Sequence, residues 1–155
     1  MTISEIITLI VALGGWGLAA FIAWLNYRQK SDEIFYHALD WLSGKSQRRN
    51  LGIAAIEAYW ENNRFRDMSI SLLINSAIYL ILESHQEDAE HELNNLSRMM
   101  NLVLNVKQVS KRHRFHYNSL YDALKKAKSR EKQEKGLVIP GEKLDEWSRR
   151  LETLL

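Results

Sequence analysis

"IITLIVALGGWGLAAFIAWL", which runs from Ile6 to Leu25, contains no charged residue. At a rise of about 1.5 Å per residue, a helix of this length matches the hydrocarbon core of a bilayer, which is about 30 Å thick. Ten of its side chains are Leu, Ile, Val or Phe, and each of these contributes about −0.3 to −0.6 kcal/mol to membrane insertion. The stretch therefore predicts a transmembrane helix close to the N-terminus.

A cleavable signal peptide is the main alternative for this stretch. Signal peptides begin with positive charge and have a shorter apolar run, whereas the only charged side chain before this run is Glu5. These differences favour a membrane anchor. Arg28 and Lys30 follow the run, and the positive-inside rule places such a flank in the cytoplasm. We therefore expect a single-pass protein of the inner (cytoplasmic) membrane, with an anchor at residues 1–30 and a cytoplasmic domain at residues 31–155.

Small residues recur along one face of the predicted span. Gly15, Ala19 and Ala23 follow one another at intervals of one helical turn, and small faces let membrane helices approach closely. Glycine and alanine are also common in membrane spans, so a chance pattern is the alternative to a packing face. The span contains no charged side chain and is not expected to carry a proton relay or an ion site of its own.

The rest of the chain has the composition of a helical protein. One proline and seven glycines leave few helix breakers, and apolar residues recur at helical rather than alternating spacing. The chain has no cysteine, which excludes disulfides, thiolate metal sites and a cysteine nucleophile. A net charge of +2 argues against a strongly basic protein that binds duplex nucleic acid. We expect an all-α protein, with one N-terminal transmembrane helix followed by a cytoplasmic helical bundle.

Capping residues and apolar spacing indicate the helices of that bundle. Ser31 can begin a helix that ends at Gly44, or this segment can continue the membrane helix, and Ser46 can cap the next helix. A helix near 67–83 is apolar nearly all round from Met68 to Leu82, which indicates either a central core helix or a second span. Further helices are expected near 88–109 and 111–135, and a last one carries the apolar residues Leu144, Trp147, Leu151 and Leu154, which either close the bundle or pair with a neighbouring chain.

Sequence signatures of common enzymes are missing. The chain has no P-loop, no dinucleotide-binding glycine motif, no nucleophile-elbow serine and no H-E-x-x-H zinc motif. His85 and His91 lie among glutamates, but their spacing does not put them on one helix face, which favours a solvated acidic surface over a metal site. His113 and His116 have cationic neighbours that would repel a metal ion. We therefore expect no metal site, no cofactor and no enzyme activity.

Positive charge is concentrated in one part of the chain. From Lys107 to Lys135 there are ten Lys or Arg against three Asp or Glu, and the segment includes "KRHRFHY" at Lys111–Tyr117. Three interpretations are open: a solvated face above buried aromatic residues, attraction to anionic lipid headgroups, or a site in which arginines bind phosphate and rings stack on bases. The candidate ligand-binding residues are Lys107, Lys111, Arg112, His113, Arg114, Phe115, His116 and Tyr117, with Arg48 and Arg49 in reserve.

A family resemblance bears on these interpretations. The N-terminal span, the stretch "SQRRNLGIAAIEAYW" at Ser46–Trp60 and the stretch "SAIYLILES" at Ser76–Ser84 together resemble the small membrane effector of type III CRISPR systems. The resemblance implies a role in antiviral defence, activation by cyclic tetra-adenylate, a helical cytoplasmic domain, and a tetramer that binds the messenger between subunits. The sequence shows no Rossmann-like sensing domain, which most receptors for such messengers carry.

The implied ligand and the basic cluster agree in their geometry. A cyclic tetranucleotide repeats one phosphate and one base in each quarter, so a symmetric homo-oligomer can present the same residues to every quarter. We therefore expect a membrane-anchored effector that binds a cyclic oligoadenylate and then perturbs or permeabilises the bilayer. The alternative is a membrane-tethered interaction protein that recruits a cytoplasmic protein partner or anionic lipid.

Overall fold

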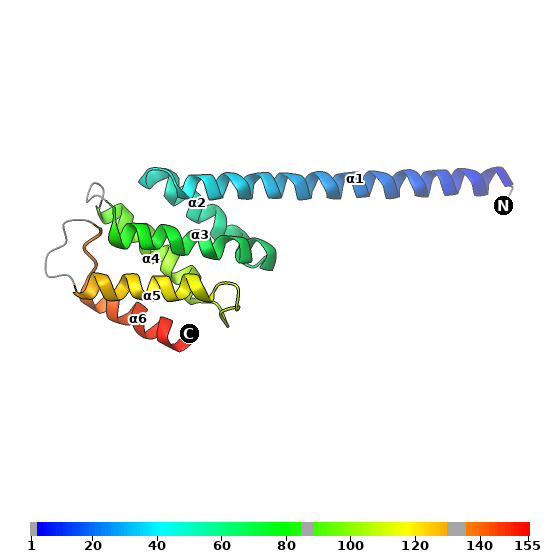
Figure 1. Cartoon of the computed structure of the whole chain (residues 1–155). Coiled ribbons are helices and arrows are strands. Elements are labelled where there is room, and N and C mark those ends of the chain that lie inside the picture. The colour runs from blue at the N-terminus through cyan, green and yellow to red at the C-terminus, as the bar shows by residue number, and fades with distance from the viewer. Residues whose placement is uncertain (1–2, 85–88, 130–135) are drawn as a thin grey trace. The chain divides into compact units, whose positions relative to one another are not determined.

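The computed structural model describes residues 3–84, 89–129 and 136–155 and, within an N-terminal helix, omits the side chains at positions 5 and 7–11. The described residues form six α-helices and no strand, which confirms the all-α prediction (Figure 1). The chain divides into two compact units, Met1–Tyr36 and His37–Leu155. The helices are α1 (Ile3–Leu42), α2 (Ser46–Tyr59), α3 (Asn63–Leu82), α4 (Ala89–Leu104), α5 (Arg114–Ser129) and α6 (Gly141–Leu154).

The N-terminal unit contains only part of α1, which continues without a break to Leu42. The segment from Ser31 therefore extends the N-terminal helix and does not begin a new one. A unit made of one helix has no second element against which to bury an apolar face. Large apolar and aromatic side chains between Leu13 and Tyr27 are accordingly exposed: Leu13, Trp16, Leu18, Phe21, Ile22, Trp24 and Tyr27.

One helix with fully described side chains is long and apolar enough to cross a membrane, and it is α3, in the middle of the chain. The same test admits the core helix of a soluble bundle, and 44% of the most apolar window of α3 is buried within the protein. The predicted span at Ile6–Leu25 includes side chains that lie outside the described residues. The N-terminal span therefore stays a prediction, whereas α3 contributes to the core of the bundle.

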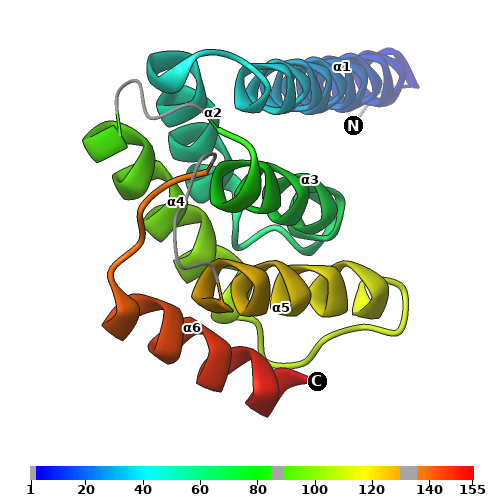
Figure 2. The same ribbon diagram turned by 60° about the vertical axis from the view of Figure 1, so that its left-hand side comes forward.

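The C-terminal unit is built around α3. This helix packs against α2, α4 and α5, and Figure 2 shows it between α2 and α5. Five of its apolar side chains are fully buried: Leu73, Ile74, Ala77, Leu80 and Ile81. Helix α6 packs on α5 and α4 through buried Leu144, Trp147 and Leu151. Of the two roles open for this last helix, the structure shows that it closes the bundle.

Two helix starts differ from those expected. Helix α3 begins at Asn63, earlier than predicted, because the Asn62 side chain accepts a hydrogen bond of 3.1 Å from the Arg64 amide and so satisfies one of the free N–H groups of the first turn. Helix α2 begins at Ser46 itself, with Lys45 as the preceding residue and no side-chain cap. The prediction that Ser46 caps this helix was therefore wrong.

Two further boundaries surround the basic cluster. Helix α4 ends at Leu104, earlier than the predicted 109, and α5 begins only at Arg114. Lys111 and Arg112 consequently lie in the connection between the two helices, not on the helix that the sequence predicted. The expected extension of α5 to Lys135 falls partly on residues 130–135, outside the described residues.

Buried Arg49 joins the last turn of α1 to α4. Its Nε donates to the Leu42 carbonyl at 3.1 Å, one terminal nitrogen donates to the Gly44 carbonyl at 2.9 Å, and the other pairs with the Glu92 carboxylate. Both charged side chains are 9% exposed. Since each of the three nitrogens of this guanidinium already has a partner within the protein, Arg49 is a structural residue. Its reserve place among the ligand-binding residues is corrected accordingly.

Close backbone packing reinforces this junction. Gly52 of α2 faces the end of α1 so closely that an added Cβ would lie 2.7 Å from the Ala38 carbonyl oxygen. Asn95 of α4 donates to the Ser46 carbonyl at 3.1 Å and to the Glu92 carboxylate at 3.3 Å. One polar network thus links the end of α1, the start of α2 and helix α4. This network is separate from the apolar core around α3.

We predict that Arg49→Met destabilises the protein by about 3–5 kcal/mol, because it leaves the Glu92 carboxylate buried without a cationic partner. Urea unfolding of the full-length chain in detergent micelles, followed by circular dichroism, measures the loss. Exposed Arg48 supplies the matched control, and Arg48→Met is expected to change stability by less than about 0.5 kcal/mol. Equal effects of the two substitutions would contradict the structural role of Arg49.

Candidate ligand-binding site

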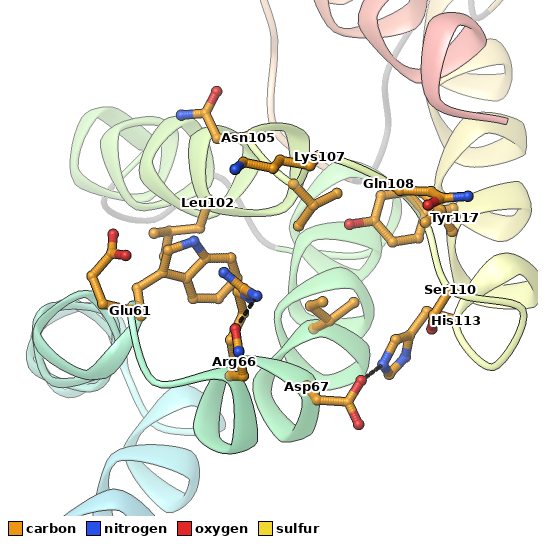
Figure 3. A pocket seen from close by; sticks show the side chains of 15 residues that line it. Glu61, Arg66, Asp67, Leu102, Asn105, Lys107, Gln108, Ser110, His113 and Tyr117 are labelled. Carbon is orange, nitrogen blue, oxygen red and sulfur yellow. Dashed lines mark hydrogen bonds and ion pairs between the residues drawn. The ribbon is translucent and has the colours of Figure 1, made fainter.

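A cavity of about 860 Å³ lies where the end of α2, the start of α3 and the α4–α5 connection meet (Figure 3). Its volume falls in the range of sites for small molecules and cofactors, which is about 300–1,000 Å³. All of its lining residues belong to the C-terminal unit: Trp60, Glu61, Asn63, Arg66, Asp67, Ile70, Leu102, Asn105, Val106, Lys107, Gln108, Val109, Ser110, His113 and Tyr117.

The lining combines charged, amide and aromatic groups. Figure 3 shows Lys107 and Asn105 on the side of α4, and Arg66 and Asp67 on the side of α3. Lys107 is exposed, and among the described residues its amine has no hydrogen-bond or ion-pair partner. The Arg66 guanidinium is held in place by a hydrogen bond to the Asn63 side chain. Two cationic groups therefore face the same cavity, and one of them is unpaired.

His113 links the α4–α5 connection to α3. Its Nε2 lies 2.6 Å from Asp67 Oδ1 and its Nδ1 lies 3.2 Å from Ser71 Oγ. Because an ionised carboxylate only accepts hydrogen bonds, the two contacts fit the ring tautomer in which Nε2–H donates to Asp67 and Nδ1 accepts from the Ser71 hydroxyl. The His113 side chain is only 4% exposed. Its ring braces two segments and presents little surface on which a base can stack.

A serine, a histidine and an aspartate in contact invite comparison with a nucleophilic triad. In such triads the nucleophile is exposed to substrate and shares a hydrogen bond with the base. Here Ser71 lies one helical turn beyond Asp67 on α3 and does not line the cavity. Among the described residues, no group of three His, Asp or Glu is placed to hold a metal ion, and His85 lies outside them. The arrangement acts as a brace.

Tyr117 lies fully buried at the wall of the cavity. Its hydroxyl donates to the Val103 carbonyl at 2.7 Å, and Val103 lies in the last turn of α4, where carbonyls have no partner within the helix. Burial raises the pKa of the phenol well above its ordinary value, so the hydroxyl stays protonated as a donor. The prediction that Tyr117 is a stacking platform is corrected, because its ring is enclosed by the core.

The rest of the basic cluster lies on the surface. Lys111 and Arg112 are exposed, with Arg112 at 3.2 Å from Asp67 Oδ2. Arg114 donates to the C-terminal Leu155 carbonyl. Phe115 is 75% exposed and its ring stands edge-on to that of half-buried His116. None of these five residues lines the cavity, nor does exposed Arg48.

The structure thus brings only part of the predicted set to the cavity: Lys107, His113 and Tyr117. Sequence patterns did not point to the other polar and aromatic lining residues, notably Trp60, Arg66, Asn105 and Gln108. Trp60 directly precedes the short turn "ENN" and Arg66 follows it after two more residues, and an aromatic residue and a cation on either side of a turn are a signal that was available. Their meeting with the α4–α5 connection depends on how the helices pack.

A second cavity, of about 680 Å³, lies over the Arg49–Glu92 pair and includes Lys45, Asn75 and Tyr79 in its lining. The two buried charges at its base are already paired with each other.

Comparison of the chain with models of protein families, with curated proteins and with solved structures finds no match. The fold and the lining define an all-helical protein with one helix apolar enough to span a membrane and a mixed polar and aromatic cavity in its bundle.

We predict that Asp67→Ala destabilises the protein by about 1–3 kcal/mol, because buried His113 loses the acceptor of its Nε2–H. Urea unfolding of the full-length chain measures the change. Arg112→Ala is the matched control, since it removes the other partner of Asp67, a side chain that is 79% exposed and whose ion pair is worth at most about 1 kcal/mol. A larger loss with Arg112→Ala would contradict the brace.

Proposed function

We propose that this protein is a membrane-anchored effector of antiviral defence that binds a cyclic oligoadenylate, with cyclic tetra-adenylate as the expected ligand, and then perturbs or permeabilises the inner membrane. The resemblance to the small membrane effector of type III CRISPR systems motivates the choice of ligand. The proposal includes a single N-terminal span, a bundle in the cytoplasm, a homo-oligomer that is expected to be a tetramer, and no enzyme activity of its own.

The observation that carries the proposal is the continuity of α1, which is one helix from Ile3 to Leu42. Its N-terminal part is apolar and exposed within a unit that offers it no packing partner. Burying such a surface in lipid removes it from water at a gain of about 25 cal/mol per Å². The described side chains include the pair Trp24 and Arg28, whose guanidinium lies 5.6 Å from the indole centroid, and both residue types are common at membrane interfaces.

The other end of the same helix supports a means of transmission. Leu42 and the neighbouring Gly44 accept hydrogen bonds from Arg49, so the last turn of α1 cannot shift without disturbing α2 and α4. A rearrangement among bundles that share one ligand would therefore turn or tilt the membrane segments. Repacking of the Gly15, Ala19 and Ala23 faces would then follow within the bilayer.

The exposed members of the basic cluster support ligand binding between subunits. Lys111, Arg112 and Phe115 are exposed, which leaves them accessible to a ligand that is shared with a neighbouring chain. In a symmetric ring each subunit supplies the same cations and the same ring to one quarter of a cyclic tetranucleotide. The alternative function, recruitment of a protein partner or of anionic lipid, relies on the same exposed surface and predicts no response to the nucleotide.

A test of transmission uses liposomes that contain the full-length protein and an entrapped dye. We predict that cyclic tetra-adenylate releases dye from the native protein, and that seven Gly and Ser residues inserted after Lys30 abolish release while ligand binding persists, because the insertion breaks α1. The matched control inserts seven helix-forming residues, which add about two turns and keep the helix continuous. It should retain release.

Both variants are first checked for retention in the membrane through carbonate and high-salt washes. Dye release that survives the Gly and Ser insertion would rule out transmission through a rigid α1. If the native protein binds the ligand but releases no dye, the membrane effect is excluded. Absence of any binding would favour the recruitment of a partner.

Binding through the exposed arginines has its own test. We predict that Arg112→Gln together with Arg114→Gln weakens binding of cyclic tetra-adenylate and flattens its dependence on salt concentration, because fewer cations contact phosphate. Calorimetric titration at several salt concentrations measures both effects. Arg149→Gln together with Arg64→Gln is the matched control, since these exposed arginines lie elsewhere in the sequence. Unchanged affinity and slope in the first variant would place the ligand on another surface.

A further inference from the structure

We propose that the cavity between α2, α3 and the α4–α5 connection is a second binding site, contained within one chain, for a nucleoside monophosphate. Of the basic cluster, Lys107, His113 and Tyr117 line this cavity, whereas Lys111, Arg112, Arg114, Phe115 and His116 do not. The proposal therefore depends neither on the exposed arginines nor on a membrane effect.

Two cations are available for a phosphate group. Arg66 is half-buried and its guanidinium is oriented by Asn63, while Lys107 is exposed and unpaired among the described residues. Arginine can offer paired donors to phosphate oxygens, and lysine adds a mobile charge. Arg66 lies on α3, and Lys107 lies just beyond the end of α4. A phosphate between them would therefore bridge the two sides of the cavity that Figure 3 shows.

Acidic residues in the lining do not cancel this attraction. Asp67 accepts hydrogen bonds from Arg112 and from His113, so both of its carboxylate oxygens already have partners within the protein. Glu61 is exposed and lies next to Trp60 in the chain. A carboxylate there accepts hydrogen bonds from an exocyclic amino group, which adenine, cytosine and guanine carry. Glu61 thus favours an amino-bearing base over a second anion.

Trp60 supplies the surface for that base. It lines the cavity and is half-buried, with its backbone held by a hydrogen bond to the Glu57 carbonyl at 3.2 Å. Stacking of a base on an aromatic side chain is tolerant of sequence and strong. The side-chain amide oxygen of Asn105 accepts a hydrogen bond of 2.7 Å from Arg150, which fixes the orientation of this amide and leaves its NH₂ group as the donor. The lining thus offers an aromatic ring, a hydrogen-bond donor and an acceptor for the base, and two cations for the phosphate of a nucleotide.

The test is calorimetric titration of the full-length protein in detergent micelles with adenosine monophosphate as the probe. Adenosine and ribose 5-phosphate serve as probes for the two halves of the ligand. We expect adenosine monophosphate to bind at least tenfold more tightly than either half, because base and phosphate are recognised together. Equal affinity for ribose 5-phosphate and adenosine monophosphate would overturn the proposal, as would the absence of binding at millimolar probe concentration.

Substitutions locate the site. Lys107→Ala should weaken binding of adenosine monophosphate about tenfold and reduce its salt dependence, whereas Lys111→Ala, four positions along the same connection and outside the cavity, should change neither. Trp60→Leu should weaken binding of adenosine monophosphate and leave ribose 5-phosphate unaffected. Both lysines are exposed, so these two variants are expected to keep the stability of the native chain. Equal losses for Lys107→Ala and Lys111→Ala would overturn the assignment.

Competition separates this site from the proposed effector site. Saturating adenosine monophosphate should leave the binding of cyclic tetra-adenylate to the native protein unchanged, since the two ligands are proposed to occupy different sites. If cyclic tetra-adenylate does not bind at all while adenosine monophosphate does, the proposed function fails and the cavity site stands. Loss of adenosine monophosphate binding in the Arg112→Gln and Arg114→Gln variant would show that the exposed cluster is the site and would overturn the inference.

Discussion

The bundle depends on the ion pair between Arg49 and Glu92. Two charges that are 9% exposed carry a large desolvation cost, which is offset only when every donor and acceptor has a partner. Arg49 meets this condition by binding the carbonyls that end α1 as well as the carboxylate on α4. The pair therefore specifies where α1 stops, where α2 starts and how α4 lies against both. The apolar contacts of α3 could tolerate small shifts, but this network could not.

Helix α1 is one continuous helix that belongs to both units of the chain. From His37 onward it belongs to the bundle, whereas the residues before that point form a unit of their own. A long helix in which one part has no protein partner for its apolar side chains requires another apolar medium, or another copy of itself, to cover them. A bilayer would supply the first and oligomerisation the second. The backbone of α1 itself is continuous from Ile3 to Leu42.

The residues of the basic cluster, Lys107 and Lys111–Tyr117, have different surroundings in the structure. His113 and Tyr117 face inward, where one braces α3 through Asp67 and the other closes the end of α4 through the Val103 carbonyl. Arg114 and Phe115 lie between them in the sequence, but both side chains are exposed on the surface. The interior members hold the α4–α5 connection in place, and that connection carries Lys107 to the edge of the cavity. The position of Lys107 at the cavity therefore depends on the buried contacts of His113 and Tyr117.

The sequence by itself determined the helical class, the positions of most helices, and the apolar face of α6, because helical periodicity is a local property of the chain. Leu144, Trp147 and Leu151 are buried as their spacing predicts. Tertiary structure decided the rest. No glycine or proline lies between Leu104 and Arg114, so the end of α4 could not be located from helix breakers and is defined by Tyr117 folding back onto Val103. Arg48 and Arg49 are likewise indistinguishable in sequence, and only the neighbouring Glu92, far along the chain, makes one of them structural. The cavity brings together Trp60, from the turn after α2, and Lys107, from the α4–α5 connection. A juxtaposition across such a distance in sequence arises from packing, which local patterns do not encode.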